Sequence, residues 1–232
     1  MRASHFLYYE GTTNDPIAFR DAFRDRFGAE LAGLPGVRSV LLYTQGNYDD
    51  PYLDDAAGPF LLCRTEFNSV GALFAALEAN ADKLNFAEPA QLPAFKGSVR
   101  DEVMFGVQYP TTPDPWGRDP LGETAYFVAY PNTAADRDSF IAYYTAHHPP
   151  LLGQLPGIRA TVLYTPTDMT SPLATTPADH MLICDVSFAT LDALNASLQS
   201  DVRKVLREDY HQFPPFEGDP IHSAMTKSDG TP

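Results

Sequence analysis

Two adjacent histidines, His147 and His148, are the residues of this chain best suited to chemistry. They follow an aromatic stretch and precede a double proline, predicted to stop the helix, and a Leu-Pro-Gly turn at 155–157. An imidazole titrates near neutral pH and is the usual side chain for moving protons. A histidine one helical turn after a phenol, as His148 is after Tyr144, suits proton transfer at carbon. The reactions of this type are decarboxylation, dehydration, aldol-type cyclisation and isomerisation.

The chain matches itself at a shift of 121 residues. Without gaps, residues 5–104 align with residues 126–225, and 28 of these 100 pairs are identical. The matches include two motifs and both cysteines: Leu34-Pro35-Gly36 with Leu155-Pro156-Gly157, Leu42-Tyr43-Thr44 with Leu163-Tyr164-Thr165, and Cys63 with Cys184. A fixed internal period indicates a duplicated structural unit, so the differences between the copies are informative about function.

One such difference falls on the first predicted helix of each copy. In the first copy an apolar stripe toward the sheet consists of three phenylalanines at four-residue spacing, Phe19, Phe23 and Phe27. The matching residues of the second copy are Phe140, Tyr144 and His148. His148 is therefore predicted to point inward. His147 matches Arg26 and lies about 100° further around the helix, toward solvent or the rim of a pocket.

A buried imidazole needs hydrogen-bond partners. Tyr144 is the nearest candidate, and the predicted strands of the second copy offer five more: Tyr126, Tyr130, Tyr164, Asp185 and His222. We predict that His148 is the general acid or base, that Tyr144 orients it, and that Asp185 or His222 is its partner. The three strand tyrosines, with His147 and His222, are predicted to contact the substrate. The structural alternative is a core histidine whose hydrogen bonds are satisfied.

Each copy is predicted to fold in the order β-α-β-β-α-β, the ferredoxin-like unit of the α+β class. In the first copy the predicted strands are 5–10, 37–44, 60–67 and 99–107, and the predicted helices run over 16–32 and from Asn68 or Ser69 to about Leu84. The antiparallel sheet of such a unit carries helices on one face and leaves the other face to be covered. The second copy is the natural cover, which gives one pseudo-twofold barrel.

The third strand of each copy separates two kinds of residues. Leu61, Cys63, Thr65 and Phe67 would share one face, as would their matches Leu182, Cys184, Val186 and Phe188. We assign this face to the core under the helices, with the cysteines as small core residues. The opposite face carries Arg64 and Glu66 in one copy and Asp185 and Ser187 in the other. These polar residues line a wet cavity or pair across the interface between the copies.

Composition limits the class of protein. The chain has 232 residues, 44% of them hydrophobic, and a formal net charge of −14, which disfavours binding to phosphate backbones. No run approaches the ~20 apolar residues of a membrane helix, and the start has no apolar leader. Two cysteines without metal spacing suit a reducing, cytoplasmic location. The predicted organisation is a first repeat over 1–108, a proline-rich linker over 109–124, a second repeat over 125–226 and a tail over 227–232.

The pattern Tyr144-x-x-x-His148-x-Pro150-Leu151, followed by Leu155-Pro156-Gly157, resembles the EthD family of the dimeric α+β barrel superfamily. The first copy departs from this motif, with Phe27, Ala29 and Glu30 at the corresponding positions. The resemblance implies a barrel of two ferredoxin-like units, here fused in one chain, with a pocket near the first helix. It also implies chemistry without an organic cofactor, since related proteins include decarboxylases, cyclases acting on aromatic polyketide acids, and lactone isomerases.

The leading functional hypothesis is therefore a cofactor-independent lyase or isomerase acting on a small aromatic or cyclic metabolite, in some cases carboxylated. The alternative is a small-ligand-binding or stress-related barrel without catalysis, and a weaker one is an assembly protein; a further homodimer is compatible with each. Phosphate-binding, metalloprotease and nucleophile-elbow motifs are absent from the sequence. Two other hypotheses are a metal held by His148, His222 and Asp185, and a haem with His148, His211 or His222 as axial ligand.

Overall fold

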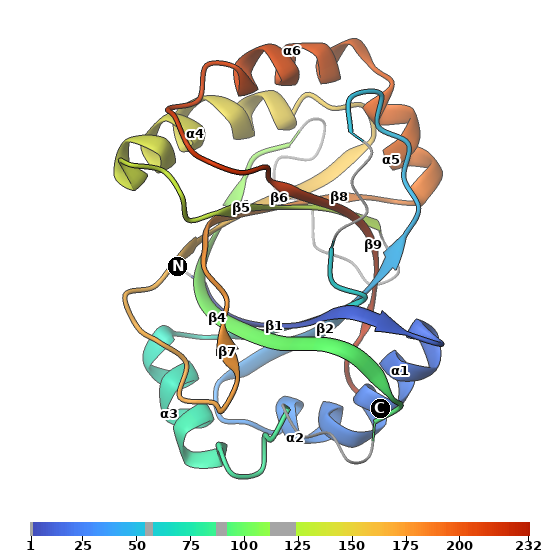
Figure 1. Cartoon of the computed structure of the whole chain (residues 1–232), viewed down its shortest axis with the longest axis vertical. Helices are drawn as coiled ribbons and strands as arrows, with labels where there is room; N and C mark the ends of the chain where they lie inside the picture. Colours follow the sequence, from blue (N-terminus) through green and yellow to red (C-terminus); the bar gives the residue numbers. More distant parts are fainter. Residues whose placement is uncertain (1, 54–57, 87–91, 112–123) are drawn as a thin grey trace.

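The strands of the two repeats join edge to edge into one closed antiparallel barrel (Figure 1). The computed structural model describes residues 2–53, 58–86, 92–111 and 124–232. Eight strands close the barrel in the order β1-β3-β2-β9-β5-β8-β6-β4, with β4 returning to β1. A two-residue strand, β7, pairs in parallel with β4. The predicted α+β barrel is confirmed.

The elements occur in the following order along the chain. The first repeat contains β1 (Arg2–Thr13), α1 (Pro16–Phe23), the π-helical segment η1 (Arg24–Gly28), α2 (Ala29–Ala32), β2 (Val37–Gly46), β3 (Leu61–Phe67), α3 (Val70–Asn80) and β4 (Phe95–Tyr109). The second contains β5 (Thr124–Pro131), α4 (Arg137–Leu152), β6 (Ile158–Pro166), β7 (Thr176–Pro177), β8 (His180–Phe188), α5 (Leu191–Leu198), α6 (Asp201–Tyr210) and β9 (Ile221–Asp229).

The strand register repeats with the sequence. Ala3 pairs with Phe67 in the first repeat, and the residues 121 positions later, Thr124 and Phe188, pair in the second. The bulge between Val37 and Ser39 also recurs, between Ile158 and Ala160. The two repeats thus share the pairing of their strands as well as part of their amino-acid sequence. The two copies meet where β2 pairs with β9 and β4 pairs with β6.

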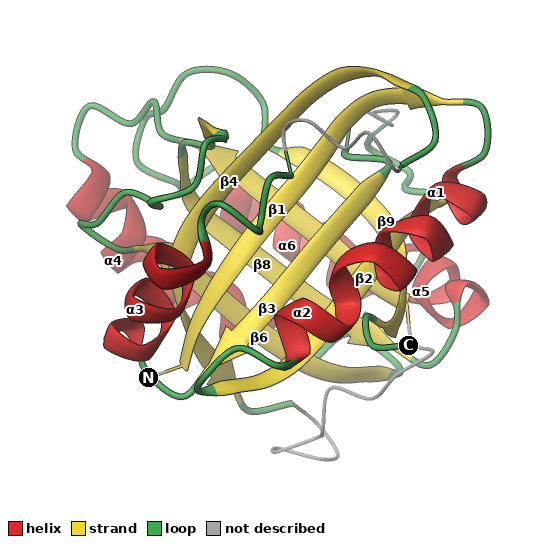
Figure 2. Ribbon diagram, turned by 90° about the horizontal axis from the view of Figure 1, so that it is seen from below, coloured by secondary structure: helices red, strands yellow, loops and turns green. Residues whose placement is uncertain are grey.

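Helices cover the outside of the barrel on two opposite sides (Figures 1 and 2). Side chains at the N-termini of α1 and α3 cap these helices where the sequence predicts that they begin: Asp15 accepts hydrogen bonds from the amides of Ile17 and Ala18, and Ser69 accepts one from Ala72. Their apolar stripes pack on the sheet, and Phe19, Phe23, Phe27, Phe140, Tyr144 and His148 are all buried. The inward position predicted for His148 is therefore confirmed.

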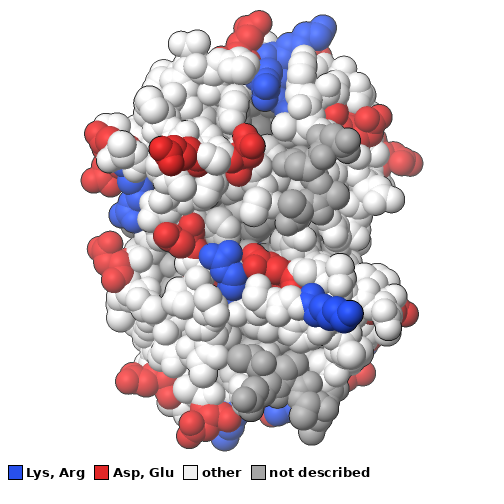
Figure 3. Space-filling model, viewed as in Figure 1, with Lys and Arg blue, Asp and Glu red and all other residues white. Residues whose placement is uncertain are grey.

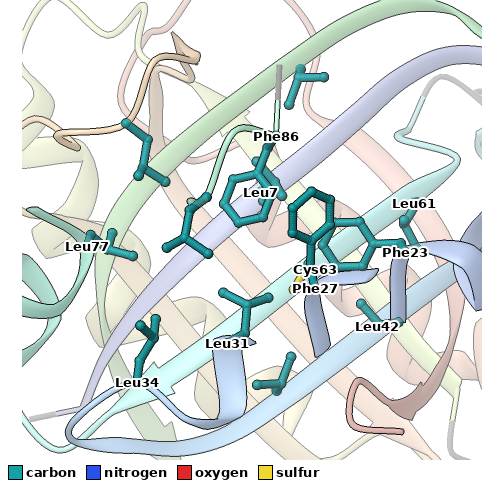
Figure 4. Packing of buried hydrophobic residues seen from close by; sticks show 14 of the residues in the cluster. Leu7, Phe23, Phe27, Leu31, Leu34, Leu42, Leu61, Cys63, Leu77 and Phe86 are labelled. Carbon is teal, nitrogen blue, oxygen red and sulfur yellow. The ribbon is translucent and has the colours of Figure 1, made fainter. Parts of the chain in front are cut away.

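The two faces of the third strand divide as predicted. Leu61, Cys63 and Phe67 belong to the core of the first repeat, where they pack with the helix side chains shown in Figure 4. Leu182, Cys184 and Phe188 do the same in the second repeat. Burial raises the pKa of both Cys63 and Cys184 to about 12, so each thiol remains protonated and unreactive at neutral pH.

The opposite face forms the barrel interior and holds buried charges. Asp185 lies 3.1 Å from the ammonium of Lys227 and 3.5 Å from the guanidinium of Arg64. Its other contact is with the hydroxyl of Tyr43, which donates to a carboxylate oxygen at 3.0 Å. Because Arg64 and Tyr43 belong to the first repeat, these polar residues pair across the interface between the copies, as one of the two predicted arrangements requires.

Four local predictions need correction. α3 ends at Asn80 rather than near Leu84. α4 continues through Pro149 and Pro150 to Leu152, because two prolines in the last turn remove few intrahelical hydrogen bonds. The first half of the predicted tail, 227–229, is part of β9, in which Lys227 is buried. The repeats also differ, since α6 has no equivalent helix among the described residues of the first repeat.

Most of the predicted linker, at 112–123, lies outside the described residues. None of the helices in the described part of the chain is long and apolar enough to cross a bilayer. Acidic and basic side chains are interspersed over the face shown in Figure 3. This distribution agrees with an acidic surface that serves solvation.

Candidate active site

The second repeat contains a cavity of about 380 Å³ between its helices and the outer face of its sheet. Strands β5, β8 and β9 form the floor, and α4, α5 and α6 supply most of the walls. The polar and aromatic residues of its lining are Tyr52, Tyr126, Tyr130, Tyr144, His148, Phe188, Arg203, Arg207, Tyr210, Asp219 and His222. Leucine and valine side chains, with Cys184 and Pro220, supply the remainder. A largely apolar cavity of this size with few polar groups is typical of a small-molecule site.

His148 is fixed in the cavity wall by a residue from a different helix. Its Nδ1 atom lies 2.7 Å from Oδ2 of Asp209 on α6. The imidazole also packs against the rings of Tyr144 and Phe213, with centroid distances of 4.8 and 5.1 Å. A carboxylate at Nδ1 stabilises the tautomer that carries its proton there, which leaves the Nε2 lone pair for a ligand in the cavity.

The surroundings of His148 favour its neutral form. Burial lowers the pKa of His148 below its ordinary value, although the hydrogen bond and the charge of Asp209 act in the opposite direction. Arg203 and His222 lower this pKa further. An imidazole that is neutral at physiological pH and held at one nitrogen is equipped to act first as a base.

Tyr144 touches His148 through its ring. Burial, together with neighbouring Cys184 and Tyr130, raises the pKa of Tyr144 well above its ordinary value, so its hydroxyl stays protonated. The ring of Tyr130 packs edge-on against Tyr144 at 5.3 Å. The ring of Tyr144 thus packs against the imidazole, and Asp209 accepts the hydrogen bond from Nδ1.

A loop of the first repeat closes one side of the cavity. Asp50 accepts two hydrogen bonds from the guanidinium of Arg203, at 2.9 and 3.1 Å, and one from the hydroxyl of Tyr126 at 3.1 Å. Tyr52, two residues further on, lies under the same guanidinium at 5.1 Å. The site therefore needs both repeats, although its histidine belongs to the second.

The structure brings together five of the predicted site residues and separates three. Tyr126, Tyr130, Tyr144, His148 and His222 line the cavity. Asp185 and Tyr164 lie on the barrel-interior face, because their strand positions point away from the helices. His147 is exposed on the outer side of α4, where its ring stacks on Tyr143 at 4.3 Å. The predicted partner of His148 was thus wrong: Asp209 takes that place, and neither Asp185 nor His222 does.

The corresponding space in the first repeat is filled. Phe86 packs against Phe23 and Phe27 with centroid distances of 6.1 and 4.9 Å, as Figure 4 shows, and stacks on His5 at 6.5 Å. His5 matches Tyr126, and its Nε2 lies 2.7 Å from Asp101, the match of His222. The first repeat keeps polar groups on these strands, and the ring of Phe86 packs beside them.

The site residues missed from the sequence lie on α6 and on the loop of the first repeat. Asp209, Arg203 and Arg207 come from the segment where the two repeats share little sequence. One signal was present: Phe86 of the first repeat matches Arg207, so an apolar residue that fills space is exchanged for a charged one. Asp50 could not be assigned, because a loop gives no periodic pattern from which its direction follows.

The positions of the predicted metal and haem ligands were compared with what each kind of site needs. Among the described residues, no three His, Cys, Asp or Glu side chains are grouped as a metal site requires. Asp185 is on the other face of the sheet from His148 and His222. His211 is exposed and is not part of the cavity lining.

Fold and site together define a fused α+β barrel with a cavity between the helices and the sheet of its second repeat. Residues 132–214 match the EthD domain model, so the resemblance predicted from the histidine motif is confirmed for the second repeat. This stretch includes His148 and Asp209, and it excludes the loop that carries Asp50. A search of curated proteins found no matching sequence.

Solved structures share the whole fold at low sequence identity. An anthrone oxidase-like protein matches with a TM-score of 0.64 and 13% identity, over 99% of this chain and 93% of its own. A candidate monooxygenase from Fusobacterium nucleatum matches with a TM-score of 0.60 and 10% identity, over 98% and 94%. A candidate monooxygenase from Lactobacillus acidophilus matches with a TM-score of 0.50 and 14% identity, over 99% and 97%. At these identities the likeness concerns the fold.

Proposed function

We propose that this protein is a lyase or isomerase that moves a proton at a carbon atom of a small aromatic or cyclic metabolite, with His148 as general base and acid. The observation that carries this proposal is the Asp209–His148 pair in the wall of the cavity. A small-molecule-processing barrel also agrees with the names of the structural neighbours, anthrone oxidase-like and monooxygenase.

The proposed step follows from the state of the imidazole. Nε2 of neutral His148 takes a proton from an acidic carbon, for example one next to a ring carbonyl, and the electron pair of the C–H bond moves into the enolate or phenolate. The imidazolium is stabilised by the carboxylate of Asp209 at Nδ1. Returning the proton to another carbon gives isomerisation. In decarboxylation, the electron pair of the C–C bond to the departing carbon dioxide stays on the ring as an enolate or phenolate. The protonated form of His148 gives its proton to that carbon, and solvent restores the proton to the imidazole.

The rest of the cavity serves binding in this proposal. Tyr126, Tyr130 and Tyr210 supply rings against which a flat ligand packs, and Tyr144 keeps the imidazole in place. An apolar lining excludes water, so the proton stays between His148 and the ligand. Chemistry of this kind needs no organic cofactor, and its cofactor independence belongs to the proposal.

Incubation with a panel of hydroxylated naphthoic acids and bicyclic ketones, followed by mass spectrometry, tests the proposal. The wild type should form a product with at least one compound, and His148→Phe, which restores the residue type of Phe27, should form none while remaining folded. His147→Gln is the matched control and should behave as the wild type, because His147 is exposed. Tight binding without any product would instead support the ligand-binding alternative.

A further inference from the structure

Arg207 is a cation in the cavity wall that forms no ion pair with the described residues. Its guanidinium lies over the ring of Tyr210 at 5.2 Å and over the ring of Tyr52 at 5.8 Å. No carboxylate in the described ranges lies within ion-pairing distance of it. The two aromatic rings hold the guanidinium plane in place, so little conformational freedom remains to be lost on binding an anion.

Arg203, the other arginine of the cavity, is already neutralised. It donates from Nε and Nη2 to the two oxygens of Asp50, which is a bidentate ion pair. Asp209 is engaged with His148, and Asp219 is exposed at the rim. Within the described part of the chain, no carboxylate takes up the donors of Arg207, in contrast to those of Arg203.

The geometry of α6 places Arg207 and the catalytic histidine on opposite flanks of the same cavity. Leu206 is buried and points into the cavity. At about 100° per residue, Arg207 lies about 100° to one side of Leu206, and Asp209 lies about 60° to the other side. Asp209 contacts His148. A flat ligand lying across Leu206 therefore reaches the guanidinium at one end and the imidazole at the other.

We infer that the ligand of this cavity carries a carboxylate and that Arg207 binds it. A planar guanidinium matches a carboxylate through two parallel N–H···O hydrogen bonds, and it does so most strongly where water is largely excluded. The volume of 380 Å³ exceeds the roughly 150 Å³ that accommodates a benzene ring, so a bicyclic ring with one carboxylate is a suitable size. This inference rests on the proposed function for the role of His148, and it adds the substrate class.

Two probes of equal shape test the charge. The dissociation constants of 2-naphthoate and of its neutral amide, 2-naphthamide, are measured by calorimetry with the wild type, Arg207→Gln and Arg207→Lys. The wild type should bind 2-naphthoate about tenfold or more tighter than 2-naphthamide, since a charge-assisted pair is replaced by a neutral one. Arg207→Gln should lose this preference and leave the binding of the amide unchanged. Arg207→Lys should keep part of it, because lysine retains the charge without the planar fork.

Lys204→Gln is the matched control for the loss of one positive charge on α6. Lys204 is exposed and pairs with Asp201, so this variant should keep the full preference for the carboxylate. A wild type that binds neither probe, or binds both equally, would overturn the inference, as would an Arg207→Gln protein that still prefers 2-naphthoate. If the protein prefers the carboxylate but converts no compound, the proposed function alone is contradicted. If it converts a compound in a way that depends on His148 but does not prefer the carboxylate, the inference alone is contradicted.

Discussion

Nδ1 of His148 lies 2.7 Å from a carboxylate oxygen of Asp209, and the two residues sit on different helices. His148 belongs to α4, whose sequence motif resembles EthD. Asp209 belongs to α6, which has no equivalent helix among the described residues of the first repeat. The candidate site thus differs from the described part of the first repeat by more than the exchange of Phe27 for His148. The partner of this histidine comes from α6.

Replacing Asp209 by asparagine should shift the pH dependence of proton transfer. Asp209 raises the pKa of His148, against the larger effect of burial, so its loss should lower that pKa further. The neutral imidazole is the proposed base, and the acid limb of the rate should therefore move to lower pH. The plateau rate should fall by about tenfold or more, because the tautomer is no longer fixed.

The rate for this test is the exchange of the α-protons of 2-tetralone for deuterium, followed by NMR across the acidic pH range. Asp138→Asn, a carboxylate in the first turn of α4, serves as the control variant. An Asp209→Asn protein with an unshifted acid limb would show that Asp209 has no influence on the base.

Replacing Asp50 by asparagine should destabilise the protein by about 3 kcal/mol. The substitution leaves the buried guanidinium of Arg203 without its bidentate carboxylate and weakens the contact with Tyr126. Urea unfolding provides the measurement. The exposed i,i+4 pair of Arg26 with Glu30 is the comparison, since Glu30→Gln should change the stability by no more than about 0.5 kcal/mol. Equal effects of the two substitutions would contradict the buried role of Asp50.

Deleting residues 227–232 should open the barrel. The deletion removes the pairing of Tyr43, Leu42 and Leu41 with the end of β9, and with it the ammonium 3.1 Å from buried Asp185. The protein should lose cooperative thermal unfolding or expose apolar surface to a hydrophobic dye. The milder Lys227→Met, which keeps the backbone pairing, should fold with a lowered melting temperature. Native-like melting of the truncated protein would show that this end of β9 is dispensable.

The stability of the protein should fall in mild acid, and His148 should contribute to this fall. Its pKa in the folded state is below the ordinary value of 6.5, so the unfolded chain binds a proton more readily. The contribution is fully present above about pH 6.5 and is lost as the pH falls toward the folded-state pKa. Between about pH 7.5 and about pH 5.5, His148→Phe should therefore lose less unfolding free energy than the wild type, as measured in urea. Identical losses would contradict the lowered pKa.

The fold was accessible from the sequence because the duplication and the periodic patterns agree. Four-residue spacing of phenylalanines placed the helix stripe, and alternation along the third strand placed Cys63 under the helices and Arg64 inside the barrel. Each of these inferences uses a periodicity that runs through several residues of one helix or strand. These periodic patterns can be recognised in both repeats at the 121-residue shift, even where few residues are identical.

The site was only partly accessible, for physical reasons that differ from residue to residue. His148 was found because its counterpart is a core phenylalanine. Asp185 was placed correctly on the strand face opposite Cys184, but that face points away from the helices, so its predicted role as partner of His148 was wrong. Asp209 and Asp50 reach the cavity from elements whose orientation depends on tertiary packing, which local patterns do not encode.

The central claim is that His148 moves a proton at carbon within this cavity. Exchange of the α-protons of 2-tetralone in deuterium oxide measures that step directly. Because this ketone is neutral, the exchange rate does not depend on carboxylate binding by Arg207. The wild type should accelerate exchange above the uncatalysed rate, and His148→Phe should return it to that rate while His147→Gln does not. Exchange at the uncatalysed rate with wild-type protein, or undiminished exchange with His148→Phe, would contradict the account.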